Sequence, residues 1–167
     1  MGFWEKVLPG YKGYREREDS RNSDKLLREY LSKQLKEARN LFDEVKLALT
    51  KRGNLDLLDP AEKVTQVMSR VIDRLRYANY GFSGKWFGKD KIDVERLEKV
   101  HRFDEAMGEG VQKAAEQIRA MEPMGDAELK GALSEMVHAV RAMDEALNER
   151  ENILRAVGGS QPDADET

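Results

Sequence analysis

Four long stretches of this chain place apolar residues three or four positions apart, and this spacing limits the possible folds most strongly. Leu27, Leu31 and Leu35 illustrate it in the first stretch, and it is the pattern of a helix with one buried face. The predicted helices cover about residues 20–51, 60–80, 94–121 and 127–157. Short turns between consecutive helices favour antiparallel neighbours. The sequence therefore predicts an all-α fold, an antiparallel up-down-up-down four-helix bundle.

Residues with strong turn preferences mark the ends of these helices. Gly53 and Asn54 follow the first helix, and glycine is a common residue just past a helix end. Asp59 and Pro60 are suited to the N-cap and the first position of the second helix. The predicted organisation is an aromatic N-terminal extension over 1–19, a bundle over 20–158 with an aromatic and glycine-rich loop between its second and third helices, and an acidic tail over 159–167 that is expected to be disordered.

Composition excludes several kinds of protein. The 167 residues suit one domain, and the absence of cysteine excludes disulfides and thiolate metal sites. No apolar run approaches the ~18 residues of a membrane span. The N-terminal residues include Glu5, Lys6 and Pro9 where a signal peptide would need an apolar run. The expected location is the cytoplasm, with attachment to the surface of the inner membrane as a further possibility.

Charge is distributed unequally along the chain. Residues 1–92 contain 20 Lys and Arg against 14 Asp and Glu, whereas residues 93–167 contain 9 against 18. One interpretation is a basic face that meets an anionic partner. The interpretation that the sequence favours is that the two halves pack side by side and neutralise each other.

Aromatic residues gather in two segments, one at the N-terminus and one between the second and third predicted helices. In the predicted topology both segments lie at the same end of the bundle. Lysines and arginines accompany them, so we call this region the aromatic-basic end. Its candidate binding residues are Phe3, Trp4, Tyr11, Tyr14, Arg15, Arg17, Tyr80, Phe82, Lys85, Trp86 and Phe87.

Three interpretations fit the aromatic-basic end. Its aromatic side chains could bury one another and close the end of the bundle, because aromatic pairs stabilise each other beyond their burial. They could instead form a docking surface for a protein, since Trp, Tyr and Arg dominate interface hot spots. They could also insert into an anionic membrane surface beside the basic residues. Nucleic acid is disfavoured because the sequence pI is about 5.6.

The motif Glu-x-x-His occurs twice and suggests a di-metal site, with Glu98, His101, Glu135 and His138 as ligands. Helical phase argues against it, because His138 lies about 180° from the centre of the apolar stripe of its helix. The two histidines also differ by about 10 Å in level along the bundle axis. The di-metal bundle therefore remains a remote alternative.

No other enzyme signature is present. The chain lacks a phosphate-binding G-x-x-x-x-G-K-[ST] loop and a G-x-S-x-G nucleophile motif. The sequence therefore predicts a protein that is not an enzyme and that needs no cofactor.

The string PGYKGYREREDSRNSDKLLREYL, together with LDLLD, the YANYGFSG loop and RFDEAM, resembles a family of small uncharacterised bacterial helical proteins. The resemblance covers about residues 8–107 and implies a bacterial origin and a shared scaffold, with no activity attached. The function that the sequence predicts is a helical scaffold or adaptor, a monomer or weak dimer, that docks an unknown protein partner through the aromatic-basic end. Peripheral membrane association through the same end is the alternative.

Overall fold

The computed structural model describes residues 2–13, 17–77 and 94–158. Every element in these ranges is helical, and none of the described residues forms a strand. The elements are α1 (Phe3–Val7), α2 (Arg17–Lys51), the 3-10 turn η1 (Leu55–Leu57), α3 (Leu58–Tyr77), α4 (Val94–Met121) and α5 (Asp126–Gly158). The predicted all-α fold class is therefore confirmed. The tail over 159–167 and the loop over 81–92 lie outside the described residues.

The turn after α2 shows why this helix ends where the sequence predicts. Gly53 has a φ of +71°, a left-handed conformation that glycine adopts at little cost. The amide of Asn54 donates to the carbonyl of Leu49 and the amide of Gly53 donates to that of Thr50, which is the Schellman pattern. The next helix begins at Leu58, one residue before the predicted cap Asp59, because η1 leads directly into α3.

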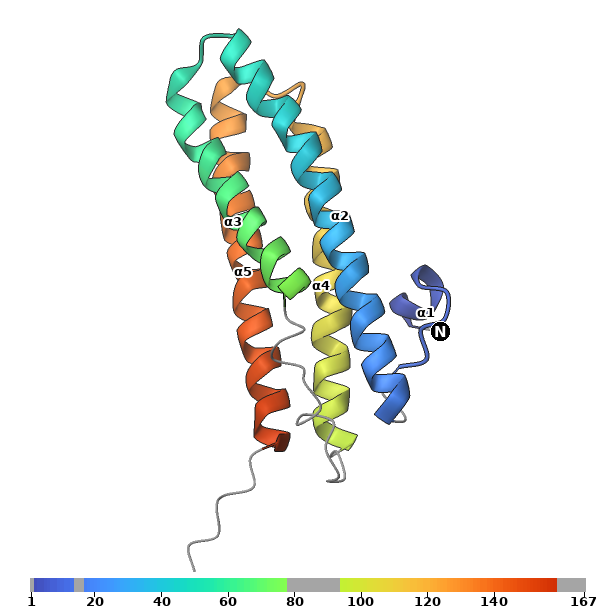
Figure 1. The fold of residues 1–167 in the computed structure, drawn as a ribbon. Coiled ribbons are helices and arrows are strands. Elements are labelled where there is room, and N and C mark those ends of the chain that lie inside the picture. The colour runs from blue at the N-terminus through green and yellow to red at the C-terminus, as the bar shows by residue number, and fades with distance from the viewer. Residues whose placement is uncertain (1, 14–16, 78–93, 159–167) are drawn as a thin grey trace, which may run out of the picture.

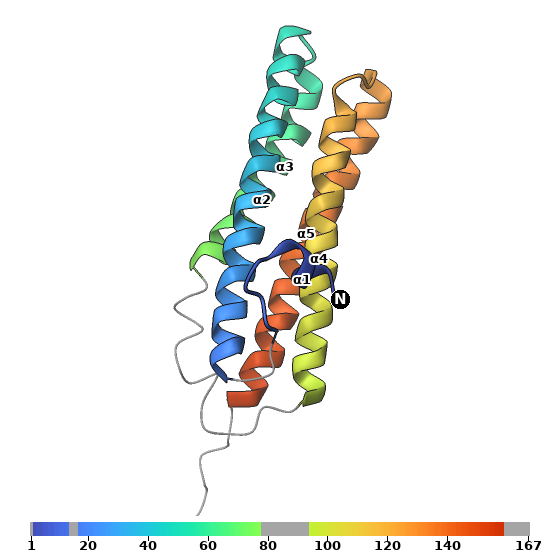
Figure 2. The same ribbon diagram turned by 90° about the vertical axis from the view of Figure 1, so that its right-hand side faces the viewer.

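The four long helices enclose one apolar core. Helix α2 packs against α3 and α4, and α5 packs against the same two helices. Figures 1 and 2 show α2 and α4 running toward the end that carries the turns, and α3 and α5 returning from it. The largest fully buried side chains of these helices are Leu27, Leu31, Leu35, Phe42, Leu49, Met68, Ile72, Leu75, Ile118, Met121 and Leu129.

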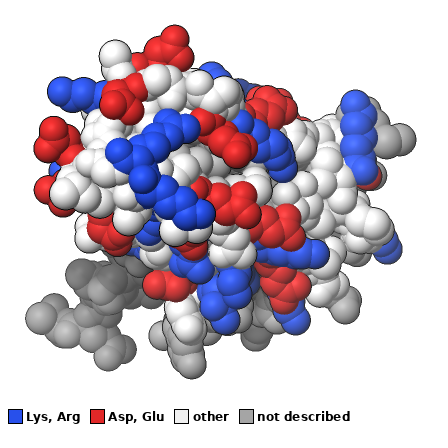
Figure 3. Space-filling view, turned by 90° about the horizontal axis from the view of Figure 1, so that it is seen from above, with Lys and Arg blue, Asp and Glu red and all other residues white. Residues whose placement is uncertain are grey.

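The end with the turns, which we call the turn end, carries charges of both signs. Figure 3 looks onto this end and shows Lys and Arg interspersed with Asp and Glu. One arginine joins the two turns, because Arg52 of the first donates to the carbonyls of Glu122 and Met124 in the second. The side chains visible in that view therefore do not form a surface of a single sign.

The N-terminal segment, residues 2–13, differs from its prediction in two ways. Its residues Phe3–Val7 form a short helix, α1, where the sequence predicts non-helical chain. Figure 2 places α1 on the side of the bundle, over α4 and beside α2, and α1 contacts α4. The segment therefore covers the flank between two helices and does not close the end of the bundle.

None of the described helices is both long enough and apolar enough to cross a membrane.

Candidate functional site

The N-terminal segment is anchored by Trp4, whose side chain is fully buried. Its ring meets that of Phe3 edge to face at 5.0 Å between centroids and that of Tyr30 on α2 at 5.7 Å. Tyr11 adds a tilted contact at 6.3 Å. Each such aromatic pair adds about 0.5–1.5 kcal/mol beyond the burial of apolar area. We call Phe3, Trp4, Tyr11 and Tyr30 the aromatic cluster.

Gly108 of α4 makes room for this cluster. A Cβ atom at this position would overlap Phe3 Cε1 and lie 2.9 Å from Trp4 Cζ2. Gly108 lies inside continuous helix α4, which covers the residues that the sequence predicts for it. Because glycine has no side chain, this position allows a close contact between α4 and the N-terminal segment.

The indole Nε1 of Trp4 has no hydrogen-bond partner among the described residues, although it is buried. A buried donor without an acceptor costs about 1–3 kcal/mol. The aromatic cluster is therefore held by the shape and the apolar area of its rings.

Tyr11 connects the aromatic cluster to polar residues of α4. Its hydroxyl lies 3.1 Å from Nδ1 of His101, and the two rings stack at 6.3 Å. The other ring nitrogen of His101 lies 3.3 Å from Glu105 Oε1. Burial, and next the nearby carboxylate of Asp104, raise the pKa of Tyr11 well above its ordinary value. The phenol is therefore held in its neutral form.

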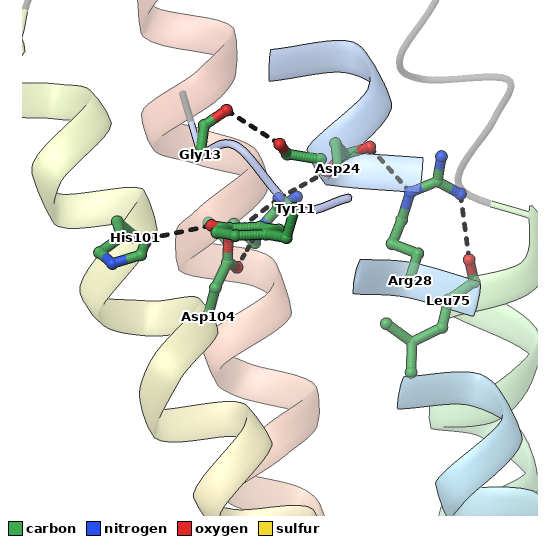
Figure 4. Close-up of polar contacts among 9 residues, drawn as sticks. Tyr11, Gly13, Asp24, Arg28, Leu75, His101 and Asp104 are labelled. Atoms are coloured by element: carbon green, nitrogen blue, oxygen red, sulfur yellow. Dashed lines mark hydrogen bonds and ion pairs between the residues drawn. The ribbon is translucent and has the colours of Figure 1, made fainter. Parts of the chain in front are cut away.

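A network of buried charges lies beside Tyr11 and joins three helices (Figure 4). Arg150 of α5 donates to Asp24 of α2 at 2.6 Å and to Asp104 of α4 at 2.7 Å. Arg28 donates to the other oxygen of Asp24 at 2.9 Å. All four side chains are at most 7% exposed. We call Asp24, Arg28, Asp104 and Arg150 the buried charge network.

The buried charge network also secures the end of α3, and the neighbouring Ser23 secures the N-terminal segment. Arg28 Nη1 donates to the carbonyl of Leu75, at 3.2 Å, in the last turn of α3, where helix carbonyls have no partner within the helix. Ser23, next to Asp24, donates to the carbonyl of Gly13. Two arginines neutralise two aspartates here, so the arrangement acts as a clamp between helices.

An open groove about 350 Å³ in volume runs along α2 beside the end of α3. Among the described residues, its walls carry exposed Lys25, Lys33, Lys36 and Arg76 with one carboxylate, Glu29, and Arg28, Ser32 and Leu75 also line it. We call it the basic groove. Next to it the ring of Tyr77 is 60% exposed, and the Arg76 guanidinium lies 5.8 Å from its centre. This is an exposed combination of cations and an aromatic ring on rigid helices.

A second open groove, about 580 Å³, lies between α4 and α5. Its lining is mostly apolar and small, and comprises Phe103, Ala106, Met107, Gly110, Ala139, Ala142, Met143 and Ala146 with Lys113, Gln117 and Glu135.

The predicted binding residues do not form one exposed surface. Trp4 and Tyr11 are buried and Phe3 is partly buried against the core, so these rings pack together, although on the flank of the bundle and not at its end. The side chains of Tyr14, Arg15, Arg17, Tyr80, Phe82, Lys85, Trp86 and Phe87 lie outside the described part of the structure.

The four residues of the remote metal site do not come together. His138, Glu135 and Glu98 are exposed, whereas His101 contacts Tyr11 and Glu105. Among the residues whose side chains are described, no group of three or more His, Cys, Asp or Glu has the arrangement of a metal site.

The buried charge network is absent from the sequence-based predictions, although a signal for it exists. Asp104 lies four residues after Val100 and three before Met107, and Arg150 lies three after Leu147. Charged residues in phase with an apolar stripe are buried together with it, and buried charges are paired. The basic groove has a similar signal, because Lys25, Lys33 and Lys36 share one face of α2.

No protein-family model, no curated protein and no solved structure matches this chain.

Proposed function

We propose that this chain is a non-enzymatic helical scaffold or adaptor, an antiparallel up-down-up-down four-helix bundle of bacterial cytoplasm that docks a protein partner. The observation that carries this proposal is the basic groove with exposed Tyr77 at its edge. Protein interfaces are enriched in aromatic residues and arginine, and Tyr77 and Arg76 supply one of each here. The docking residues proposed here are Lys25, Lys33, Lys36, Arg76 and Tyr77. They replace Trp4 and Tyr11, which are buried.

Rigid placement supports the proposal. Arg28 donates to the carbonyl of Leu75 and so ties the end of α3 to α2 beneath the groove. Because buried contacts already hold both walls of the groove, binding of a partner would cost the adaptor little conformational entropy.

The test is photo-crosslinking from position 77 in cells of the source organism, with Tyr77 replaced by a benzoylphenylalanine. The expected result is one crosslinked protein, identified by mass spectrometry, whose yield falls at least tenfold with Lys33→Glu and Lys36→Glu together. The matched control reverses Lys63 and Lys130, which are exposed and do not line the basic groove, and it should retain the crosslink. Equal yields from both double variants would contradict the proposal.

The second candidate is peripheral association with an anionic membrane surface through the same groove. The exposed lysines favour it, since each basic residue near such a surface contributes about 1 kcal/mol. The burial of Trp4 disfavours it, because a buried ring is not presented for insertion. Co-sedimentation with phosphatidylglycerol vesicles, abolished by the Lys33 and Lys36 reversals and absent with phosphatidylcholine, would favour the membrane over a protein partner.

A further inference from the structure

The basic groove carries positive charge that its own lining does not neutralise. Of its basic residues, Arg28 is bonded to Asp24, and Lys25 lies 4.0 Å from Glu29, the one carboxylate in the described part of the lining. Lys33, Lys36 and Arg76 add three further cations, and the residues described around the groove include no second carboxylate. An anionic ligand would therefore gain attraction from several cations at once.

The spacing of the cations suits an extended peptide. Lys25, Lys33 and Lys36 occupy one face of α2, and the 11 residues from the first to the last rise about 16 Å along the helix at ~1.5 Å each. An extended chain covers that length with about five residues, and every second side chain points to the same side. Lys25 and Lys33 lie about 12 Å apart along the axis and Lys33 and Lys36 about 4.5 Å, so a short ligand with several carboxylates would meet more than one lysine.

The chain itself contains such a segment beyond α5. Residues 159–167 read GSQPDADET, with carboxylates at Asp163, Asp165 and Glu166 and no lysine or arginine. Its three carboxylates fall within four residues, so the segment concentrates negative charge over a short length.

The segment is attached within reach of the groove. Glu151 of α5 lies 3.1 Å from Arg74 of α3, two residues before Arg76. Helix α5 continues to Gly158, about 10 Å further along its axis at ~1.5 Å per residue. Five to eight extended residues beyond Gly158 span about 17–26 Å, which is enough to return along the bundle to Lys25 and Lys33.

We propose that the acidic segment 163–166 binds in the basic groove of the same molecule and competes there with the acidic surface of a partner. This inference shares its groove with the proposed function, and its test needs no partner. Exposed ion pairs are individually weak, but tethering supplies a high effective concentration of the segment. Occupancy should therefore be substantial at low salt and should fall as salt rises.

The absence of cysteine makes a single spin label straightforward. In the full-length chain, Thr167→Cys would carry a nitroxide, and NMR would record the broadening of backbone amides. The expected result is at least a threefold loss of intensity at Lys25–Lys36 and Leu75–Tyr77 in 50 mM NaCl, with little loss at Lys46 and Lys63 near the turn end. Intensity should recover in 500 mM NaCl.

Two variants test whether the broadening depends on the charges of the segment and of the groove. Neutralising the segment with Asp163→Asn, Asp165→Asn and Glu166→Gln should abolish the broadening, and so should Lys33→Glu with Lys36→Glu. Both sets lie on exposed or terminal residues, so the fold is retained, and amide spectra check it. Equal broadening in the neutralised chain, or broadening that arises only between labelled and unlabelled molecules, would overturn the proposal.

The photo-crosslinking experiment separates this inference from the proposed function. If the segment competes with the partner, neutralising it should raise the yield of the crosslink from position 77 severalfold. A crosslink with unchanged yield, together with no broadening, would reject the competing segment and retain the docking function. Broadening without any crosslink would retain the competing segment and reject the docking function.

Discussion

At the scale of single residues, the N-terminal segment depends on one position without a side chain. Gly108 lies in the middle of α4, where glycine costs up to ~1 kcal/mol relative to alanine. Its backbone lets Phe3 and Trp4 approach α4 more closely than any Cβ would allow. The helix therefore gives up some intrinsic stability in exchange for burying Trp4.

Substituting this glycine tests that account. Gly108→Ala should lower the free energy of unfolding, because overpacking costs about 1–3 kcal/mol and outweighs the gain of ~1 kcal/mol in helix propensity. Urea unfolding followed by circular dichroism measures the change. Gly131→Ala is the matched control, since Gly131 lies in α5 and a Cβ added there would meet no atom within 4 Å; it should be stabilising by about 0.5–1 kcal/mol. Equal effects of the two substitutions would contradict the close contact.

Tyr11 makes the stability of this region sensitive to alkaline pH. Its pKa in the folded chain lies above the ordinary value because burial, and then Asp104, disfavour the phenolate. A raised pKa contributes stability that is fully present below the unfolded value of about 10 and is lost as the pH rises above it. Tyr11→Phe should be less stable at pH 8, because it loses the bond to His101. The gap in free energy of unfolding between the two proteins should narrow as the pH rises from about 9.5 to 11.5. A gap that is constant with pH would show that Tyr11 does not titrate as described.

At the scale of helices, one buried side chain of α5 bonds to both α2 and α4. Arg150 bonds Asp24 on the first of these helices and Asp104 on the second. Removing a single member of a buried ion pair leaves the other charge without compensation, which is more costly than replacing the whole group by apolar residues.

Arg150→Met should therefore lower the free energy of unfolding by about 3–5 kcal/mol. Differential scanning calorimetry and urea titration measure the loss. Arg141→Met on the same helix is the control, because Arg141 is exposed, and it should change stability by no more than about 0.5 kcal/mol. A small effect at Arg150 would mean that the two aspartates are neutralised by other means.

The sequence predicts the long helices well and the N-terminal segment poorly, for a physical reason. Helices such as α2 extend over many repeats of the apolar pattern, and local signals such as Gly53 mark their ends. Helix α1 has five residues, too few for a periodic pattern. Its binding place is created by Gly108, about a hundred positions away, so no local signal locates it.

At the scale of the whole molecule, the unequal charge of the two halves is partly cancelled by contacts between them. Arg70 and Arg74 of the basic half meet Asp144 of the acidic half, and Arg74 also meets Glu151. The basic groove gathers four exposed cations of the first half, Lys25, Lys33, Lys36 and Arg76. Contacts between the halves therefore neutralise part of the charge, and a basic face that meets an anionic partner stays a prediction.

Two neighbouring arginines should differ in their effect on this contact. Arg74 is 21% exposed and donates to Asp144 and Glu151, whereas Arg70 is 70% exposed. Burial lowers the pKa of Arg74, but its bonds to Asp144 and Glu151 outweigh this and hold the pKa above its ordinary value. Arg74→Gln should cost about 1.5–3 kcal/mol, and Arg70→Gln about 0–1 kcal/mol. Thermal unfolding in 50 and 500 mM NaCl measures both losses, and the loss from Arg70→Gln should disappear at the higher salt concentration. A larger loss of stability from Arg70→Gln than from Arg74→Gln would contradict this prediction.

The buried charge network also fixes how far each helix is displaced along its neighbours. Leucine, valine and methionine recur every turn of these helices, so an apolar face can slide by one turn, about 5.4 Å, and still find apolar partners. Arg150 has no such freedom, because Asp24 and Asp104 each occur at a single level. A one-turn slip of α5 would break the bonds of buried Arg150 to both Asp24 and Asp104, and the network thereby selects one axial register among several that the apolar core would accept.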